Sequence, residues 1–141
     1  GITDEMVFQS PTLAQIFPSL LEFIGSHNET VLVAQNAPFD LSFLTFAARA
    51  HGFDWPKYPV LDTAIIARKV LSRDEVPNCK LGTLAEFFGT QTTPNHRALD
   101  DARATVDVFH GLLERLGSHD IYTLEELNNF GKKVKKQKSP E

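Results

Sequence analysis

Apolar residues recur every three or four positions along two long stretches of the chain, which predicts two amphipathic helices. The first stretch runs from Thr12 to Ile24, follows Pro11, and contains Pro18 as a site for a kink. The second ends near Gly117, and its apolar positions are Ala98, Ala102, Thr105, Phe109, Leu112, Leu113 and Leu116. The opposite face of this second helix is polar, so we expect it to meet water; it carries Asp100, Arg103, Asp107, His110 and Glu114.

Two short apolar runs are each followed directly by a helical pattern. Residues 30–34 are β-branched and continuously apolar, which favours a strand covered on both faces, as in a parallel sheet. The helix after this run begins at Asn36, which suits the N-cap, and ends at Gly52. We expect one side of it to carry Phe39, Phe43, Phe46, Ala47 and Ala50. The second run, residues 58–61, leads to Asp62, which we interpret as the cap of the next helix.

The remaining patterns indicate two further helices. One covers residues 81–88 and is closed by Gly89, and the other starts at Thr123, which forms a capping-box pattern with Glu126. Strand followed by helix, twice, predicts an α/β domain, although two short strands are few for a sheet in a domain of this size. The chain divides into a partial domain (1–117), a helical extension (118–131) and a basic flexible tail or linker (132–141).

The composition describes one domain with a sizeable hydrophobic core and an acidic body. Hydrophobic residues make up 42% of the 141 residues, and the single cysteine, Cys79, cannot form an internal disulfide, so a cytoplasmic setting fits. No apolar run approaches the ~20 residues that span a bilayer. The net charge of -4 includes a tail, residues 132–141, with five lysines and one glutamate, and without this tail the charge is -8. An acidic body suits a cation-binding site and argues against a general nucleic-acid-binding surface. The tail is either a solvated linker or an electrostatic contact with nucleic acid.

The stretch from Asn95 to Thr105 places an imidazole just ahead of a helix and two carboxylates in its first turn. With a rotation of ~100° per residue, Asp101 lies about 60° from the middle of the apolar stripe, whereas Asp100 faces water. A carboxylate that points at protein needs a partner. His96 alone would be interpreted as a surface loop histidine.

A second carboxylate, Asp40, also lies in the first turn of a helix that follows an apolar strand. Helical rotation places it on the apolar side, between Phe43, Leu44 and Ala47. One interpretation is that Asp40 and Asp101 are only first-turn acids favoured by helix dipoles. Together with a loop histidine, they look more like hard oxygen ligands for a divalent ion beside a proton-transfer group.

Two motifs resemble those of the DnaQ-like, or DEDDh, 3′-to-5′ exonucleases. They are Asn36-Ala37-x-Phe39-Asp40-x-x-Phe43-Leu44 and His96-x-Ala98-x-x-Asp101-Ala102-x-x-Thr105. Further similarity, in the family's usual order up to about residue 117, lies at Gly1-Ile2-Thr3 with Pro11, at Leu61-Asp62-Thr63 and at Leu81-x-x-Leu84-Ala85-x-x-Phe88-Gly89. A His five positions before the Asp is similar to the branch that uses His rather than Tyr. Gln35 departs from the His often found there, which we interpret as a tuning of the loop.

The resemblance implies a ribonuclease H-like fold, in which a mixed sheet is flanked by helices. It implies two divalent metal ions, Mg²⁺ or Mn²⁺, between four acids and the scissile phosphate, with Asp40 and Asp101 as two of those acids. His96 would be the general base that activates the attacking water. Asn36 and Phe39 would contact the substrate, although Phe39 is equally plausible as a helix core residue. The implied function is removal of nucleotides from the 3′ end of single-stranded DNA or RNA, by a proofreading subunit, a repair nuclease or a trimming ribonuclease.

The first motif of that family, an Asp-x-Glu, does not occur in these 141 residues. The adjacent pairs Asp4-Glu5 and Asp74-Glu75 cannot replace it easily, because neighbouring residues on a strand face opposite ways. We therefore expect an N-terminally truncated domain without its first antiparallel strands, which binds metal weakly and hydrolyses little or nothing alone.

Such a domain would leave an unpaired sheet edge beside residues 31–34, through which the chain could self-associate. A polymerase subunit or a fused C-terminal domain is the other expected partner. The alternative function is a noncatalytic remnant of the exonuclease fold that serves as an interaction module.

Overall fold

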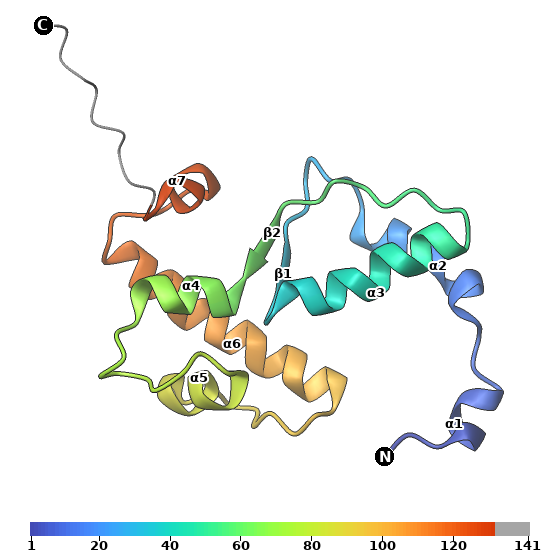
Figure 1. The fold of residues 1–141 in the computed structure, drawn as a ribbon, viewed down its shortest axis with the longest axis horizontal. Coiled ribbons are helices and arrows are strands. Elements are labelled where there is room, and N and C mark those ends of the chain that lie inside the picture. Colours follow the sequence, from blue (N-terminus) through green and yellow to red (C-terminus); the bar gives the residue numbers. More distant parts are fainter. Residues whose placement is uncertain (132–141) are drawn as a thin grey trace, which may run out of the picture. The chain divides into compact units, whose positions relative to one another are not determined.

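The computed structural model describes residues 1–131, and the predicted basic tail, residues 132–141, lies outside them. The chain forms two compact units, one from Gly1 to Asp62 and one from Thr63 onward. Figure 1 traces their helices and strands in chain order. Across the described residues, every helix is too short or too polar to cross a membrane.

The first unit contains three helices and two strands, in the order α1 (Asp4–Phe8), α2 (Leu13–Ile24), β1 (Leu32–Ala34), α3 (Ala37–Ala50) and β2 (Val60–Asp62). Helix α2 begins where the sequence predicts it, because Thr12 and Gln15 form a reciprocal capping box. Pro18 is accommodated inside this helix. Helix α1, which no pattern predicted, has no buried residue.

Strands β1 and β2 pair in parallel, as the continuously apolar run at residues 30–34 predicts. The register places Leu32 opposite Val60 and Ala34 opposite Asp62. Each strand has one edge that is not paired with another strand of the described residues. Because parallel strands end at the same edge, Asp62 lies beside the connection from β1 to α3.

The core of the first unit forms where α2 meets the alanine face of α3. Phe17 is completely buried there, next to Ala47 and Ala48, and its ring stacks on Phe53 with centroids 5.2 Å apart. The prediction that the phenylalanines of α3 share this face is wrong: Phe39, Phe43 and Phe46 are 62%, 62% and 74% exposed. Small side chains let two helices approach closely, and the three rings point away from that contact.

The second unit is entirely helical and contains α4 (Thr63–Val70), α5 (Leu81–Phe88), α6 (Ala98–Gly117) and α7 (Leu124–Asn129). Helix α6 packs against α4 and α5, which flank it in Figure 1. The bounds of α5 and α6 agree with the sequence pattern. The Thr123 hydroxyl accepts from the Glu126 N–H, but Glu126 bonds back to the N–H of Tyr122, one residue ahead of the N-cap.

The buried stripe of α6 is rotated from the predicted one. It consists of Ala104, Val108, Leu112 and Leu116. Ala98 and Ala102, predicted to be inside, are exposed, and Leu113 is 45% exposed. This rotation places Asp101 nearly in line with the buried stripe, because Asp101, Ala104 and Val108 are spaced by three and four residues.

Gly111 allows α5 and α6 to approach closely, because a Cβ atom at this position would overlap the Phe88 ring. We expect Gly111→Ala to destabilise the chain by about 1–3 kcal/mol, since overpacking outweighs the better helix propensity of alanine. Gly82→Ala in α5 is the matched control, because nothing lies within 4 Å of its added Cβ. Urea denaturation should place the control roughly 0.5–1 kcal/mol above wild type. A Gly111→Ala protein as stable as the control would contradict this packing.

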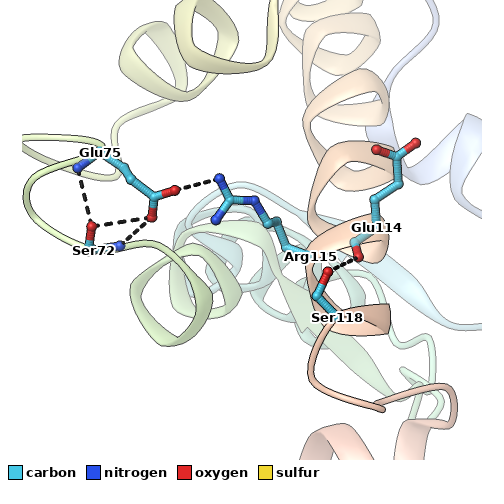
Figure 2. Close-up of polar contacts among 5 residues, drawn as sticks. All are labelled: Ser72, Glu75, Glu114, Arg115 and Ser118. Atoms are coloured by element: carbon cyan, nitrogen blue, oxygen red, sulfur yellow. Dashed lines mark hydrogen bonds and ion pairs between the residues drawn. The ribbon is translucent and has the colours of Figure 1, made fainter.

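Arg115 of α6 is tied to the loop after α4 through Glu75 (Figure 2). The Glu75 carboxylate also accepts hydrogen bonds from the backbone N–H of Ser72, at 2.9 Å, and from its hydroxyl, at 3.3 Å. The Arg115 guanidinium and the Ser72 N–H lower the pKa of Glu75 below its ordinary value of 4.5. Arg115 additionally covers the Phe87 ring, with Cζ 5.6 Å from the ring centroid.

We expect Glu75→Gln to lower the melting temperature at pH 7, by an amount that depends on pH. The pKa of Glu75 is lower in the folded state, so its contribution to stability is present above 4.5 and is lost as the pH falls through the folded-state pKa. The difference between variant and wild type should therefore narrow as the pH is lowered below 4.5. Glu114→Gln is the control, because the Glu114 carboxylate points away from Arg115 in Figure 2. A difference that does not narrow as the pH is lowered would assign the effect to something other than this charge.

Candidate functional site

The loop ahead of α6 holds His96 in a left-handed backbone conformation, with φ at +64°. The Asp101 Oδ1 atom accepts hydrogen bonds from the N–H groups of both Asn95, at 3.0 Å, and His96, at 3.2 Å. A first-turn carboxylate thus reaches back across the helix start and satisfies two backbone donors that precede it. The expectation that Asp101 points at a partner is confirmed, and the partner is the histidine loop itself.

Asp100 does not simply face water, as its helical phase predicted. Its side chain is 30% exposed, and Oδ2 accepts a 2.7 Å hydrogen bond from Nδ2 of Asn95. Arg103, one turn further along α6, lies 4.0 Å from the other oxygen, Oδ1. The loop folds back over the first turn of α6, and this covers a carboxylate that an isolated helix would expose.

Asn95 was missed by the sequence argument, although it makes three of the contacts that shape this loop. Besides its N–H bond to Asp101 and its Nδ2 bond to Asp100, its Oδ1 accepts from the N–H of Arg97, at 3.0 Å. A signal was present, because asparagine readily bonds the backbone two residues on, but nothing local predicted its contact with Asp100.

Asp40 lies in the first turn of α3, as predicted, but its side chain is exposed rather than set on the buried face. Its carboxylate accepts no hydrogen bond from any residue that the structure describes. Beside it, the Phe39 ring is 62% exposed and forms a T-shaped pair with the Phe43 ring, with centroids 5.0 Å apart. Phe39 is therefore not a core residue, and its face is accessible for stacking.

Asn36 occupies the N-cap position of α3, but its side chain does not cap the helix. Its backbone is left-handed, with φ at +60°, and its side chain makes no capping hydrogen bond. The N–H groups of Asn36 and Ala37 instead donate to the two oxygens of Asp62, at 3.0 and 2.9 Å. Asp62 is buried at the end of β2, so it fixes the turn that delivers Asp40.

The two candidate metal ligands present free carboxylate oxygens of the kind that hard divalent cations prefer. These are both oxygens of Asp40, in the first unit, and Oδ2 of Asp101, in the second. Residues 1–131 contain no group of three His, Cys, Asp or Glu side chains arranged to hold a metal ion. The donor chemistry of each carboxylate therefore fits a divalent ion, and the described residues bring no three such side chains together.

Comparison with known proteins places most of this chain within one family. A family model described as Exonuclease matches residues 1–109. A Mycobacterium tuberculosis protein, whose name provisionally describes a bifunctional exonuclease/endonuclease, is 49% identical over 130 residues, 92% of this chain and 20% of its own length. PolC-type DNA polymerases III of Caldanaerobacter subterraneus and Clostridium perfringens are 38% and 35% identical over 92% and 89% of this chain. The chain spans only 9% of these two polymerases.

Proposed function

Because the chain belongs to the exonuclease family whose model matches residues 1–109, we propose that it forms the core of a metal-dependent exonuclease that acts on 3′ ends. The observation that supports this most is the geometry at the start of α6. There, a single carboxylate, Asp101, holds the backbone of His96 with one oxygen and keeps the other free. An imidazole and a hard oxygen ligand are thus kept within a few residues of each other at one helix end, in agreement with metal-assisted phosphodiester hydrolysis.

In this proposal Asp40 and Asp101 are two of the ligands of the divalent ions, Mg²⁺ or Mn²⁺. When bound, such ions stabilise the charge that develops on the entering and leaving oxygens of the phosphodiester. His96 is exposed, and its imidazole takes the proton of the attacking water. The exposed ring of Phe39 stacks on the terminal base, and Asn36 contacts the same nucleotide.

We propose single-stranded DNA as the substrate. The names of the polymerase III relatives support it, because they describe proteins that act on DNA. A polymerase, as a subunit or as part of one chain, is the corresponding partner. An RNA substrate remains an outcome of the same assay.

The test is digestion of a 5′-labelled single-stranded DNA by the full-length protein that contains this chain, with Mg²⁺ or Mn²⁺. We expect a ladder of products that shorten one nucleotide at a time, no products with EDTA, and none from a strand whose 3′ end is blocked. Internal cleavage of the blocked strand would contradict exonuclease action in favour of an endonuclease. No cleavage of DNA or RNA would favour the noncatalytic interaction module.

Metal binding by the 141-residue chain alone is expected to be weak. Two carboxylates without further converging ligands leave a divalent ion mostly hydrated, so we expect a dissociation constant for Mn²⁺ of roughly 10⁻⁴ M or weaker. Isothermal calorimetry measures it directly. Micromolar binding accompanied by turnover would show that this chain already holds a complete site.

A further inference from the structure

The imidazole of His96 depends on its backbone for its direction. It forms no hydrogen bond or ring contact with any residue that the structure describes. Its φ of +64° is a conformation that residues with a side chain adopt uncommonly, and one that the surroundings must hold. The groups that fix residues 95–97 therefore decide where the imidazole points.

The side chain of Asn95 restrains this segment on both sides of His96. Its Oδ1 binds the N–H of Arg97, the residue after His96, and so closes a tight turn around the histidine. Its Nδ2 binds Oδ2 of Asp100 at 2.7 Å and so attaches that turn to the first turn of α6. One planar amide thus connects the turn to the rigid helix.

The contact to Asp101 alone leaves the turn less restrained. Asp101 bonds the two N–H groups through one oxygen, and the longer of these bonds, 3.2 Å, is the one to His96. Asp100 binds the side chain of Asn95 rather than the backbone of the turn. Its half-buried carboxylate accepts a short hydrogen bond from Asn95, whereas Arg103 lies 4.0 Å away. The pair of Asn95 and Asp100 is therefore a second attachment, independent of the proposed metal ligand.

We propose that Asn95 and Asp100 are positioning residues that hold His96 in the orientation its proposed role as general base requires. The inference rests on the proposed function, and it assigns a role to two residues that touch neither the substrate nor the reacting water. Loss of either attachment releases the turn, so His96 samples many orientations and is productively placed in only a fraction of them.

The experiment compares wild type with Asn95→Ala, Asp100→Ala and Asp100→Asn. Backbone ¹⁵N order parameters of the 141-residue chain should be about 0.85 at His96 in wild type and fall below about 0.6 in both alanine variants. Asp100→Asn keeps an oxygen that accepts from Asn95 and should restore the order. Arg103→Ala is the matched control, because it removes the other neighbour of Asp100 and should leave His96 ordered.

Steady-state digestion by the full-length protein supplies the second readout. We expect kcat to fall about 10- to 100-fold in the alanine variants, with KM changed less than about twofold, because the proposed contacts to the strand are made by Asn36 and Phe39. An ordered His96 in Asn95→Ala, or an unchanged kcat in active protein, would overturn the inference. If wild type digests nothing, the proposed function fails, and the order parameters still decide whether Asn95 and Asp100 hold the turn.

Discussion

Asp101→Ala is expected to reduce 3′-end hydrolysis by the full-length protein about 100-fold or more, which is the size of effect expected when a metal ligand is removed. The variant loses two functions together. Oδ1 no longer holds the N–H groups of Asn95 and His96, and Oδ2 is no longer available to a divalent ion. Single-turnover digestion of 5′-labelled DNA measures the loss without interference from product release.

Asp101→Asn separates the two functions. An amide oxygen still accepts from the two N–H groups, so His96 should stay ordered, but the negative charge that a divalent ion requires is gone. We expect hydrolysis to be lost here as well. Asp107→Asn is the control on the same helix, because Asp107 accepts only from the N–H of Gln91 among the described residues, and it should retain full activity. A tenth or more of wild-type activity in Asp101→Asn would exclude Asp101 as a ligand.

Much of the fold could be predicted because it depends on local periodicity. Helices α2, α5 and α6 have repeating apolar residues and clear ends, such as the capping box at Thr12 and the left-handed Gly89 after α5. The parallel pairing of β1 and β2 followed from an apolar run with no alternation. These signals lie within a few residues of the feature they predict.

The orientation of the helices could not be predicted in the same way. The sequence of α3 offers both a phenylalanine stripe and an alanine face, and hydrophobicity favours burying the phenylalanines. The partner of α3 decides otherwise, because the large ring of Phe17 fits against Ala47 and Ala48. Asp40 lies on nearly the same side of α3 as Ala47 but about two turns closer to the start of the helix, where its side chain is exposed.

The candidate site shows the same division between local and distant signals. His96 and Asp101 were found because they are five residues apart at one helix start. Residues so close in the sequence readily come into contact, and the N–H of His96 donates to Asp101 Oδ1. The role of Asp62 at α3 was not found, since its partners are 25 and 26 residues away and meet it only through the strand register. A sequence pattern therefore predicts that an acidic side chain binds the start of a helix only when the two are close together in the chain.

Asp62→Ala is expected to destabilise the chain by about 2–4 kcal/mol, because it leaves the buried N–H group of Ala37 and the part-buried N–H group of Asn36 without their acceptors. Urea denaturation gives the free energy of unfolding, and hydrogen exchange at the Ala37 amide shows whether the start of α3 has opened. Asp62→Asn keeps one acceptor and should cost about half as much, which provides a folded variant if the alanine protein does not fold.

Asp54→Ala is the matched control for this prediction, because Asp54 is an exposed aspartate of the same unit with no partner among the described residues, and its loss should change stability by less than about 0.5 kcal/mol. If Asp62→Ala were equally harmless, the start of α3 would have to be held by something else. If it is as costly as expected, the same variant should also weaken Mn²⁺ binding at Asp40, since the turn that Asp62 fixes is the one that positions this ligand. The stability of the first unit and the placement of a proposed metal ligand would then depend on the same buried carboxylate.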